Sequence, residues 1–257
     1  MMPNYSTNLT DSEWKLLESI QQDKRKRKHE LRVVWNAIFY LVRTGCQWRM
    51  LPTEFPKWQL VYYYYRQWRD TGVFAEVLSV IHARTRLAAG REASPSAAAI
   101  DSQSVKCARG EHRGIDGNKR VNGRKRHIAV DTTGLLMAVV VTAANVADVV
   151  AARRVIERLR HRFPRLRRIF ADSGYQGEFI AWVAALTHWV VEITHRAAGV
   201  VGFQVLPKRW VVERSFAWLN GSRRLSKDYE LLTDSSQAMI QLSAIRLMLK
   251  RLRHCNS

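Results

Sequence analysis

Two short apolar stretches, AAAID at residues 97–101 and RIFAD at residues 168–172, decide the expected fold. Each has the length of a buried β-strand, and each ends in an aspartate. In open α/β sheets, ligands gather beyond the carboxyl ends of the strands. If the two strands are neighbours, Asp101 and Asp172 therefore meet at one edge of the sheet.

The residues around these stretches predict an α/β fold. Further strands are expected at residues 127–130, 135–142 and 190–194, and helices at residues 147–160, 176–186, 210–220 and 237–252. Early strands in hairpin order, followed by strands that alternate with helices, are typical of a mixed sheet flanked by helices.

The N-terminal third of the sequence has helical periodicity instead. Thr10 and Glu13 form a potential capping box, and further helices are expected at residues 31–43, 58–69 and 74–89. The helices at residues 31–43 and 58–69 resemble a helix-turn-helix unit joined by a short turn. The polar GREASP segment at residues 90–95 marks a boundary, so the expected domains are a small all-α domain at residues 1–90 and an α/β domain at residues 96–257.

The helix at residues 58–69 is a candidate DNA contact. Lys57, Arg66 and Arg69 could meet phosphates, and the run of tyrosines at residues 62–65 could meet DNA or fill the core. Four consecutive tyrosines cannot all face one way on a helix, so both environments remain open for this run.

The net charge of +20 indicates a polyanionic partner, and nucleic acid fits better than a membrane. There is no apolar run of about 18 residues and no signal-peptide core. Three separated cysteines suggest neither a disulfide framework nor a metal site, so a cytoplasmic, nucleoid-associated protein is expected. The basic run at residues 23–30, DKRKRKHE, could be a solvated linker or an arm on the DNA backbone.

The strand-end aspartates favour metal chemistry. Two carboxylates about 4 Å apart repel by about 4 kcal/mol at an effective dielectric constant of 20, unless one is protonated or a cation lies between them. Oxygen ligands without nearby histidine or cysteine suit Mg²⁺ or Mn²⁺. A third acid, Glu213, lies beside the apolar stripe of VVERSFAWL, and Arg209 shares its helix face. Periodicity alone leaves both a surface ion pair and a catalytic role open for Glu213.

At this point the residues resemble a known family. The stretches AIDSQSVK, GRKRHIAVDTTG, FADSGYQG and RWVVERSFAWLNGSRRLSKDYE are similar to the catalytic core of bacterial insertion-sequence DDE transposases, specifically the insertion sequence five family. LTDSEWKLLE and LRVVWNAIFYLVRTGCQWRMLP resemble its N-terminal segment. The resemblance covers residues 9–252 and implies an RNase H-like catalytic domain whose catalytic, metal-holding triad is Asp101, Asp172 and Glu213.

The resemblance implies cofactors and partners. Two Mg²⁺ ions, or two Mn²⁺ ions in their place, are expected to support strand cleavage and then strand transfer. The expected partners are the double-stranded DNA of the element ends and of the target, and a second copy of the chain in a homodimer. The last helix, with Met239, Leu242, Ile245, Leu247 and Leu249, is either a dimer contact or part of the core of one protomer.

The resemblance also suggests DNA contacts. Arg209 is expected to bind a phosphate or to orient Glu213. A basic block that enters the second strand, Lys119, Arg120, Arg124, Lys125, Arg126 and His127, is expected to line a DNA path. Gly221 and Ser222 stand where relatives have a basic and an aromatic residue, although Arg223 and Arg224 follow. Ala147 replaces the usual histidine before Asp148. These departures are expected to affect DNA affinity and recognition of the element ends more than the cleavage and strand-transfer reactions.

Three other functions are compatible with parts of the pattern. They are a catalytically silent DNA-binding relative, an RNase H-like nuclease that hydrolyses without joining, and a basic architectural protein. The presence of all three acids disfavours the first and the third. The helix-turn-helix-like front half and the long run of matching motifs disfavour the second.

Overall fold

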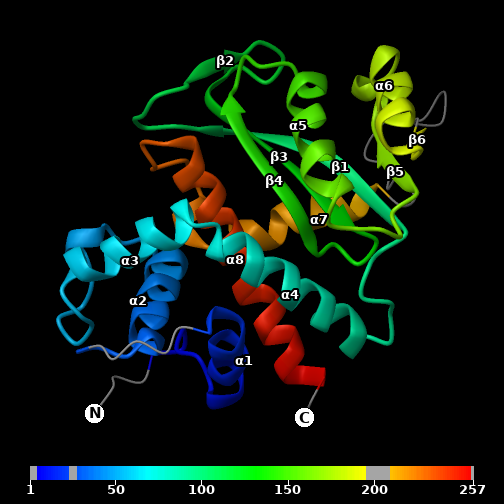
Figure 1. Ribbon diagram of the computed structural model, residues 1–257. Helices are drawn as coiled ribbons and strands as arrows, with labels where there is room; N and C mark the ends of the chain where they lie inside the picture. The colour runs from blue at the N-terminus through cyan, green and yellow to red at the C-terminus, as the bar shows by residue number, and fades with distance from the viewer. Residues whose placement is uncertain (1–4, 23–27, 195–208, 256–257) are drawn as a thin grey trace. The chain divides into compact units, whose positions relative to one another are not determined.

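The computed structural model describes residues 5–22, 28–194 and 209–255 (Figure 1). The chain forms two compact units. The first comprises Met1–Arg91, Leu219–Ser226 and Asp234–Ser257, and the second comprises Glu92–Trp218 and Lys227–Thr233. The boundary between the units falls between Arg91 and Glu92, inside the GREASP segment. The units differ from the predicted domains because residues 219–226 and 234–257 group with the first unit. Most of the basic run at residues 23–30 lies outside the described residues.

The first unit is helical. Its elements are α1 (Asp11–Gln21), α2 (Leu31–Thr44), the short 3₁₀ helix η1 (Trp48–Met50), α3 (Trp58–Asp70), α4 (Val73–Ala88), the 3₁₀ helix η3 (Arg223–Leu225) and most of α8 (Thr233–Cys255). The predicted capping box is confirmed, because Thr10 accepts from the Glu13 amide and Glu13 accepts from the Thr10 amide. An aromatic core joins α2, α3 and α4, where Trp35 stacks on Trp68 with ring centroids 5.0 Å apart.

The connection between α2 and α3 differs from the predicted short turn. It spans residues 45–57 and contains η1, so these two helices do not form a tight helix-turn-helix pair. The tight connection joins the next pair of helices, where Thr71 and Gly72 alone separate α3 from α4. Glycine suits this position because its φ is +77°, in the left-handed region.

The tyrosine run divides between two environments. Tyr65 is fully buried, and its hydroxyl donates to the Ser235 carbonyl at 3.0 Å, whereas Tyr63 is 58% exposed. Tyr65 therefore belongs to the core, and Tyr63 is available to a partner.

The second unit contains a six-stranded mixed sheet. Its strands are β1 (Ala97–Lys106), β2 (Gly114–Asp116), β3 (Val121–Asp131), β4 (Leu136–Ala143), β5 (Arg168–Ala171) and β6 (Val190–Ile193). The order is β2-β3-β1-β5-β6, and β4 also pairs with β3. The β1–β3 and β3–β4 pairs are antiparallel, whereas β1–β5 and β5–β6 are parallel. The predicted mixed sheet is confirmed, and the short strand β2 is an addition to it.

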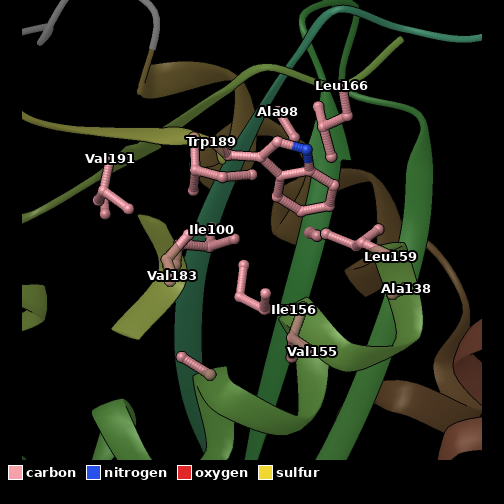
Figure 2. Packing of buried hydrophobic residues seen from close by; sticks show 14 of the residues in the cluster. Ala98, Ile100, Ala138, Val155, Ile156, Leu159, Leu166, Val183, Trp189 and Val191 are labelled. Atoms are coloured by element: carbon pink, nitrogen blue, oxygen red, sulfur yellow. The ribbon is translucent and has the colours of Figure 1, made fainter. Parts of the chain in front are cut away.

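Helices cover the sheet. They are α5 (Asp148–Arg160), α6 (Glu178–Thr187) and α7 (Trp210–Asn220), and the 3₁₀ helix η2 (Ser173–Tyr175) follows β5. The helix α5 packs on β1, β3 and β4, and Val155, Ile156 and Leu159 face the strands (Figure 2). Figure 2 shows the Trp189 indole closing this core between Ala98 and Leu166, and all three residues are at most 5% exposed. The core therefore fixes β1, which contains Asp101, and β5, which Asp172 follows.

The helix α7 is fastened to the β3–β4 turn. The Ser215 hydroxyl donates to the Gly134 carbonyl at 2.8 Å, and the Arg214 guanidinium donates to the Thr133 carbonyl at 3.0 Å. The Arg214 guanidinium also lies over the rings of Trp210 and Trp218, at 4.2 and 4.5 Å from their centroids. These contacts set the orientation of the helix that carries Glu213. Among the described helices, none is long and apolar enough to cross a membrane.

Candidate active site

The strand register places Asp101 and Asp172 at equivalent positions along two neighbouring strands. The prediction that the first strand ends at Asp101 is wrong, because β1 continues to pair with β3 as far as Lys106, and only Asp172 follows the end of its strand. In the parallel pair β1–β5, Ala97 pairs with Arg168 and Ala99 pairs with Phe170. Two residues further along each chain stand Asp101 and Asp172, so the expectation that the two strands are neighbours is confirmed. The Asp172 carboxylate raises the pKa of Asp101, which also places the two charges within electrostatic reach.

Asp101 lies in an environment that disfavours its charge. Burial is the main cause that raises its pKa from 3.8 to about 6, and the Asp172 carboxylate adds to the increase. The Ser102 amide, which donates to Asp101 Oδ1 at 2.7 Å, opposes this shift, as do the charges of Arg209 and Lys119. A buried carboxylate of this kind gains from a neighbouring cation.

Arg209 joins two of the three predicted triad members. Its Nη1 lies 3.0 Å from Asp101 Oδ2, and its Nη2 donates to Glu213 Oε1. Arg209 precedes Glu213 by four residues at the start of α7, and the two side chains share a helix face as predicted. Glu213 is therefore paired with an arginine that also holds Asp101, and it is not an isolated surface ion pair.

Tyr175 and Ser102 extend the site beyond the residues found from sequence. Tyr175 is 2% exposed in η2, and its hydroxyl is hydrogen-bonded to the Ser102 side chain. Burial raises its pKa well above the usual value, and the carboxylates of Asp101, Asp148 and Asp172 raise it further. The phenol thus stays protonated beside the acids. The only signal for Tyr175 in the sequence is an aromatic residue directly after Asp172-Ser-Gly.

A second polar cluster lies at the start of α5. Lys125 Nζ is 3.2 Å from Asp148 Oδ1 and 3.8 Å from Asp116 Oδ2. His127 Nδ1 is 3.8 Å from Asp148, and its Nε2 shares a 3.0 Å hydrogen bond with Thr142 Oγ1. Burial lowers the pKa of His127, with Asp148 opposing the shift, so the ring is neutral at pH 7. The cluster holds the N-terminus of α5 against β3 and β4.

Comparison with known proteins identifies the family. Residues 92–248, more than half of the chain, match the family described as "Transposase DDE domain", and residues 9–78 match a "Putative transposase of IS4/5 family". The chain belongs to the DDE transposase family. It is also 31% identical, over 142 residues, to a "Putative transposase for insertion sequence element IS402" from Burkholderia cepacia. That match spans 52% of this chain and 66% of the relative.

Membership of the DDE transposase family agrees with the fold. The order β4-β3-β1-β5-β6, in which only β3 runs antiparallel to its neighbours, is the RNase H-like sheet that the resemblance implied. The segment matched at residues 9–78 covers α1 to α3 and the first residues of α4.

The structure corrects the predicted DNA contacts of three basic residues in β3. Arg124 is fully buried, and it donates to Asp228 Oδ1 at 3.2 Å and to the Glu230 carbonyl at 2.9 Å. Arg126 is 1% exposed, its pKa is lowered to about 10 by burial, and it donates to the Lys227 carbonyl at 3.2 Å. Lys125 is held by Asp116 and Asp148. These side chains anchor the segment at residues 227–231 and the α5 cluster, and they do not reach a DNA surface.

Burial in the first unit corrects one predicted DNA contact and decides between the two roles that the sequence left open for the last helix. Arg224 is 8% exposed and donates to the Cys46 carbonyl at 3.1 Å, so it does not face DNA. In α8, Met239, Leu242, Ile245 and Leu249 are at most 1% exposed. These apolar residues belong to the core of one protomer and are not a dimer contact, and Leu247 is only partly buried.

The other basic residues of the prediction remain accessible. Lys57, Arg66, Lys119, Arg120 and Arg223 are exposed. Arg69 is an exception, because only 11% of its side chain is exposed and it is held by Asp70 at 2.7 Å and by the Ser235 hydroxyl at 2.7 Å. Lys119 lies close enough to Asp101 to lower the pKa of that carboxyl. Lys119 is therefore the exposed member of the predicted basic block that borders the acids.

The oxygen ligands suit a hard cation, but they are not gathered around one position. In the described part of the chain, no group of three or more histidine, cysteine, aspartate or glutamate side chains is placed to hold a metal ion. The Arg209 guanidinium donates to Asp101 Oδ2 and to Glu213 Oε1, so both oxygens are paired with it. Only carboxylate oxygens are offered, which fits Mg²⁺ or Mn²⁺ better than softer metals.

Proposed function

We propose that the protein binds the ends of an insertion sequence and catalyses metal-dependent cleavage and transfer of DNA strands. The observation that supports the proposal is that Asp101 and Asp172 lie on neighbouring parallel strands while Arg209 links Asp101 to Glu213, in a DDE transposase. The name of the relative from Burkholderia cepacia, a putative transposase, supports the same reaction class.

The acids are the proposed metal ligands. Asp101, Asp172 and Glu213 would hold two Mg²⁺ ions, or Mn²⁺ in their place. When bound, such ions supply positive charge that activates the attacking oxygen and stabilises the leaving oxygen of a phosphodiester. Burial of Asp101 favours this role, because a desolvated carboxylate interacts more strongly with a cation than an exposed one does.

The remaining residues of the site orient DNA and ligands. The Arg209 guanidinium presents a planar set of donors to a phosphate. The protonated Tyr175 hydroxyl and the Ser102 side chain are hydrogen-bonded to each other beside Asp101. Lys119 and Arg120 lie on the β2–β3 turn, where they would draw the DNA backbone toward the acids. Lys57, Arg66 and Arg223 are the proposed contacts of the first unit, and a homodimer would handle both element ends together.

The test uses duplexes that carry the inverted repeats flanking the coding region, incubated with Mg²⁺ and a supercoiled target. Wild-type protein is expected to free a 3′-hydroxyl and to join it to the target. Asp101→Asn should lower strand cleavage by at least about 10³-fold while DNA binding persists. The control Glu178→Gln changes a carboxylate that is 90% exposed on α6, and it should cleave normally.

The same assay separates the alternatives. Binding without metal-dependent nicking by wild-type protein would indicate a catalytically silent relative. Nicking without a joined product would indicate a nuclease. Undiminished cleavage by Asp101→Asn would remove the acids from the mechanism.

A further inference from the structure

The helix α3 carries an exposed polar face that the candidate active site does not use. At about 100° per residue, Gln59, Tyr63 and Arg66 lie within about 60° of one another around the helix axis. All three side chains are exposed. The structure therefore places three groups that can form hydrogen bonds on one stripe of the first unit, and we call these three residues the exposed face of α3.

The opposite side of α3 is fixed in the aromatic core. Val61, Tyr65 and Trp68 are at most 5% exposed. The Tyr65 hydroxyl donates to the Ser235 carbonyl at 3.0 Å, and the Trp68 ring is stacked on Trp35 with ring centroids 5.0 Å apart. Because these contacts prevent rotation of the helix about its axis, the exposed face of α3 stays turned toward a partner.

The side chains of this face suit the edges of bases better than phosphates. In the major groove, glutamine can form two hydrogen bonds with adenine, and arginine can form two with guanine. A face that bound only phosphates would need several cations, whereas the side chains of Gln59 and Tyr63 carry no charge. Within the described residues, the Gln59 and Arg66 side chains have no hydrogen bond or salt bridge, so their donors are available to a partner.

Positive charge surrounds this face. Lys57 is exposed and directly precedes α3, and the guanidinium of the exposed Arg49 lies 4.8 Å from the centroid of the Trp58 ring. Residues 43–70 contain five basic and two acidic residues, a net charge of 5 − 2 = +3. This charge complements a DNA duplex. A protein partner fits less well, because the core of a protein interface is apolar and Tyr63 supplies the only ring of the face.

The dimensions of the helix fit the major groove. An α-helix with its side chains is about 10–12 Å across, and the groove is about 12 Å wide. Gln59 and Arg66 are seven positions apart, which is a rise of about 10.5 Å at 1.5 Å per residue. Successive bases of one strand are about 3.4 Å apart along the duplex, so the two side chains reach base pairs about three steps apart.

The neighbouring helix α4 does not offer such a face. In a helix-turn-helix unit, the second helix of a closely connected pair lies in the major groove, and here that helix would be α4, which follows α3 after a two-residue turn. The exposed residues of α4 are Glu76, Arg84, Leu87 and Ala88. Glu76 repels phosphates, and the aliphatic side chains of Leu87 and Ala88 form no hydrogen bonds with bases. The first helix of the pair is therefore the better reader of DNA.

We propose that α3 lies in the major groove of the element end and that Gln59, Tyr63 and Arg66 read its base edges. This inference rests on the proposed binding of the element ends. Arg66 donates to a guanine, and Gln59 pairs with an adenine about three base pairs away. Tyr63 lies between them on the helix, and Lys57 binds a flanking phosphate.

The experiment compares two duplexes of equal length and base composition. One carries an inverted repeat that flanks the coding region, and the other carries the same bases in scrambled order. Fluorescence anisotropy measures the affinity of the full chain for both duplexes at several salt concentrations. All proteins carry Asp101→Asn, so that the duplexes stay intact, and thermal unfolding checks that each variant folds.

Two variants test the base contacts. Arg66→Lys keeps the charge but removes the two-pronged donor, and Gln59→Ala removes the amide. Each is expected to bind the repeat duplex about 5- to 100-fold more weakly than the parent and to bind the scrambled duplex like the parent. The slope of log K against log salt should stay the same for both variants.

Two matched controls separate base contacts from charge. Lys57→Gln should weaken binding to both duplexes by the same factor and lower the salt slope by about one. Arg84→Lys, the same substitution as Arg66→Lys but on the exposed side of α4, should change neither affinity nor slope.

Single base-pair substitutions in the repeat locate the contacts. The parent should lose affinity at a G·C pair and at an A·T pair about three base pairs apart. Arg66→Lys should become insensitive to substitution of the first pair, and Gln59→Ala to substitution of the second. Methylation of guanine N7, which faces the major groove, should weaken binding of the parent at the first position.

Three results would overturn the inference. The first is equal binding of the repeat duplex by the parent, Arg66→Lys and Gln59→Ala. The second is an equal loss of affinity by Gln59→Ala on the two duplexes. The third is a loss of discrimination in Arg84→Lys, which would assign base reading to α4. If the parent binds the two duplexes equally, the proposed binding of the element ends fails, and this inference fails with it.

Discussion

The guanidinium of Arg209 lies 3.0 Å from Oδ2 of the Asp101 carboxylate. The same guanidinium holds Glu213, so one cation already satisfies two of the three proposed metal ligands. Arg209 therefore has two chemically reasonable partners, the carboxylates and a DNA phosphate, and it cannot serve both fully at once.

The first prediction concerns this competition. Arg209→Gln should tighten Mn²⁺ binding in the absence of DNA by about 10-fold, because a like charge next to the ion is removed. Strand cleavage should nevertheless fall, because a phosphate donor is lost. Titration calorimetry with Mn²⁺ measures the first effect, and the end-cleavage assay measures the second. Arg209→Lys keeps the charge and should bind Mn²⁺ like the wild type. Unchanged or weaker Mn²⁺ binding by Arg209→Gln would show that the guanidinium does not compete.

The second prediction follows from the pKa of Asp101, which burial raises from 3.8 to about 6. A carboxyl with a raised folded-state pKa stabilises the fold most below pH 3.8, and this contribution is lost as the pH rises through 6. At pH 8 the ionised group therefore costs up to about 3 kcal/mol, at 1.36 kcal/mol per pKa unit.

Asp101→Asn should consequently stabilise the metal-free protein at pH 8 more than at pH 4. Urea unfolding in EDTA at the two pH values gives the comparison, and Glu178→Gln serves as an exposed control. Saturating Mn²⁺ should raise the stability of the wild type and have little effect on the asparagine variant. An equal change in unfolding free energy at both pH values would contradict the pKa assignment.

The third prediction separates buried from exposed basic residues. Arg124→Ala should lower the free energy of unfolding by about 3–5 kcal/mol, because Asp228 would remain buried without its partner. Lys119→Ala, on the exposed turn beside Asp101, should leave stability within about 0.5 kcal/mol. It should instead weaken DNA binding and lower the salt slope by about one. Chemical denaturation and fluorescence anisotropy distinguish the two, and the reverse pattern would restore Arg124 as a DNA contact.

The strands and the acid pair could be predicted from the sequence because their signals are local. A short apolar run that ends in aspartate predicts both strands, and Asp172 directly follows the end of β5. The run does not predict where β1 ends, because pairing with β3 extends β1 beyond Asp101 to Lys106. The helix face shared by Arg209 and Glu213 also follows from periodicity alone. That Arg209 reaches Asp101 depends on how α7 crosses the sheet, and no local pattern encodes this.

Three members of the basic block, Arg124, Lys125 and Arg126, were wrongly predicted to contact DNA, and the reason is physical. A run of arginine and lysine residues looks the same in the sequence whether its side chains face solvent or pair with a carboxylate that is distant in the sequence. Arg124 is buried because Asp228, more than a hundred residues later, lies beside it. The grouping of α8 with the first unit depends in the same way on contacts between residues far apart in sequence. Tyr175 gave no signal beyond its residue type.

The last prediction concerns the altered segment at Gly221 and Ser222. This segment packs inside the first unit, where Arg43 donates to the Gly221 carbonyl and the Ser222 hydroxyl lies 2.8 Å from that of Ser243. The following turn passes close to Gly45, where an added Cβ would lie 3.1 Å from the backbone carbon of Arg223. Gly45 has a φ of +74°, and Gly72 has a nearly identical φ of +77° with open space around it.

Gly72→Ala should therefore cost only the strain of a left-handed alanine, about 1 kcal/mol. Gly45→Ala should cost about 1–2 kcal/mol more, because the turn at Arg223 must also move. Urea unfolding of the two variants gives the difference directly, since both glycines end or begin a helix with the same backbone conformation. Equal destabilisation would mean that the turn is free to shift. A larger loss for Gly45→Ala, together with weaker DNA binding in the folded protein, would link the altered segment to the exposed Arg223 and hence to recognition of the element ends.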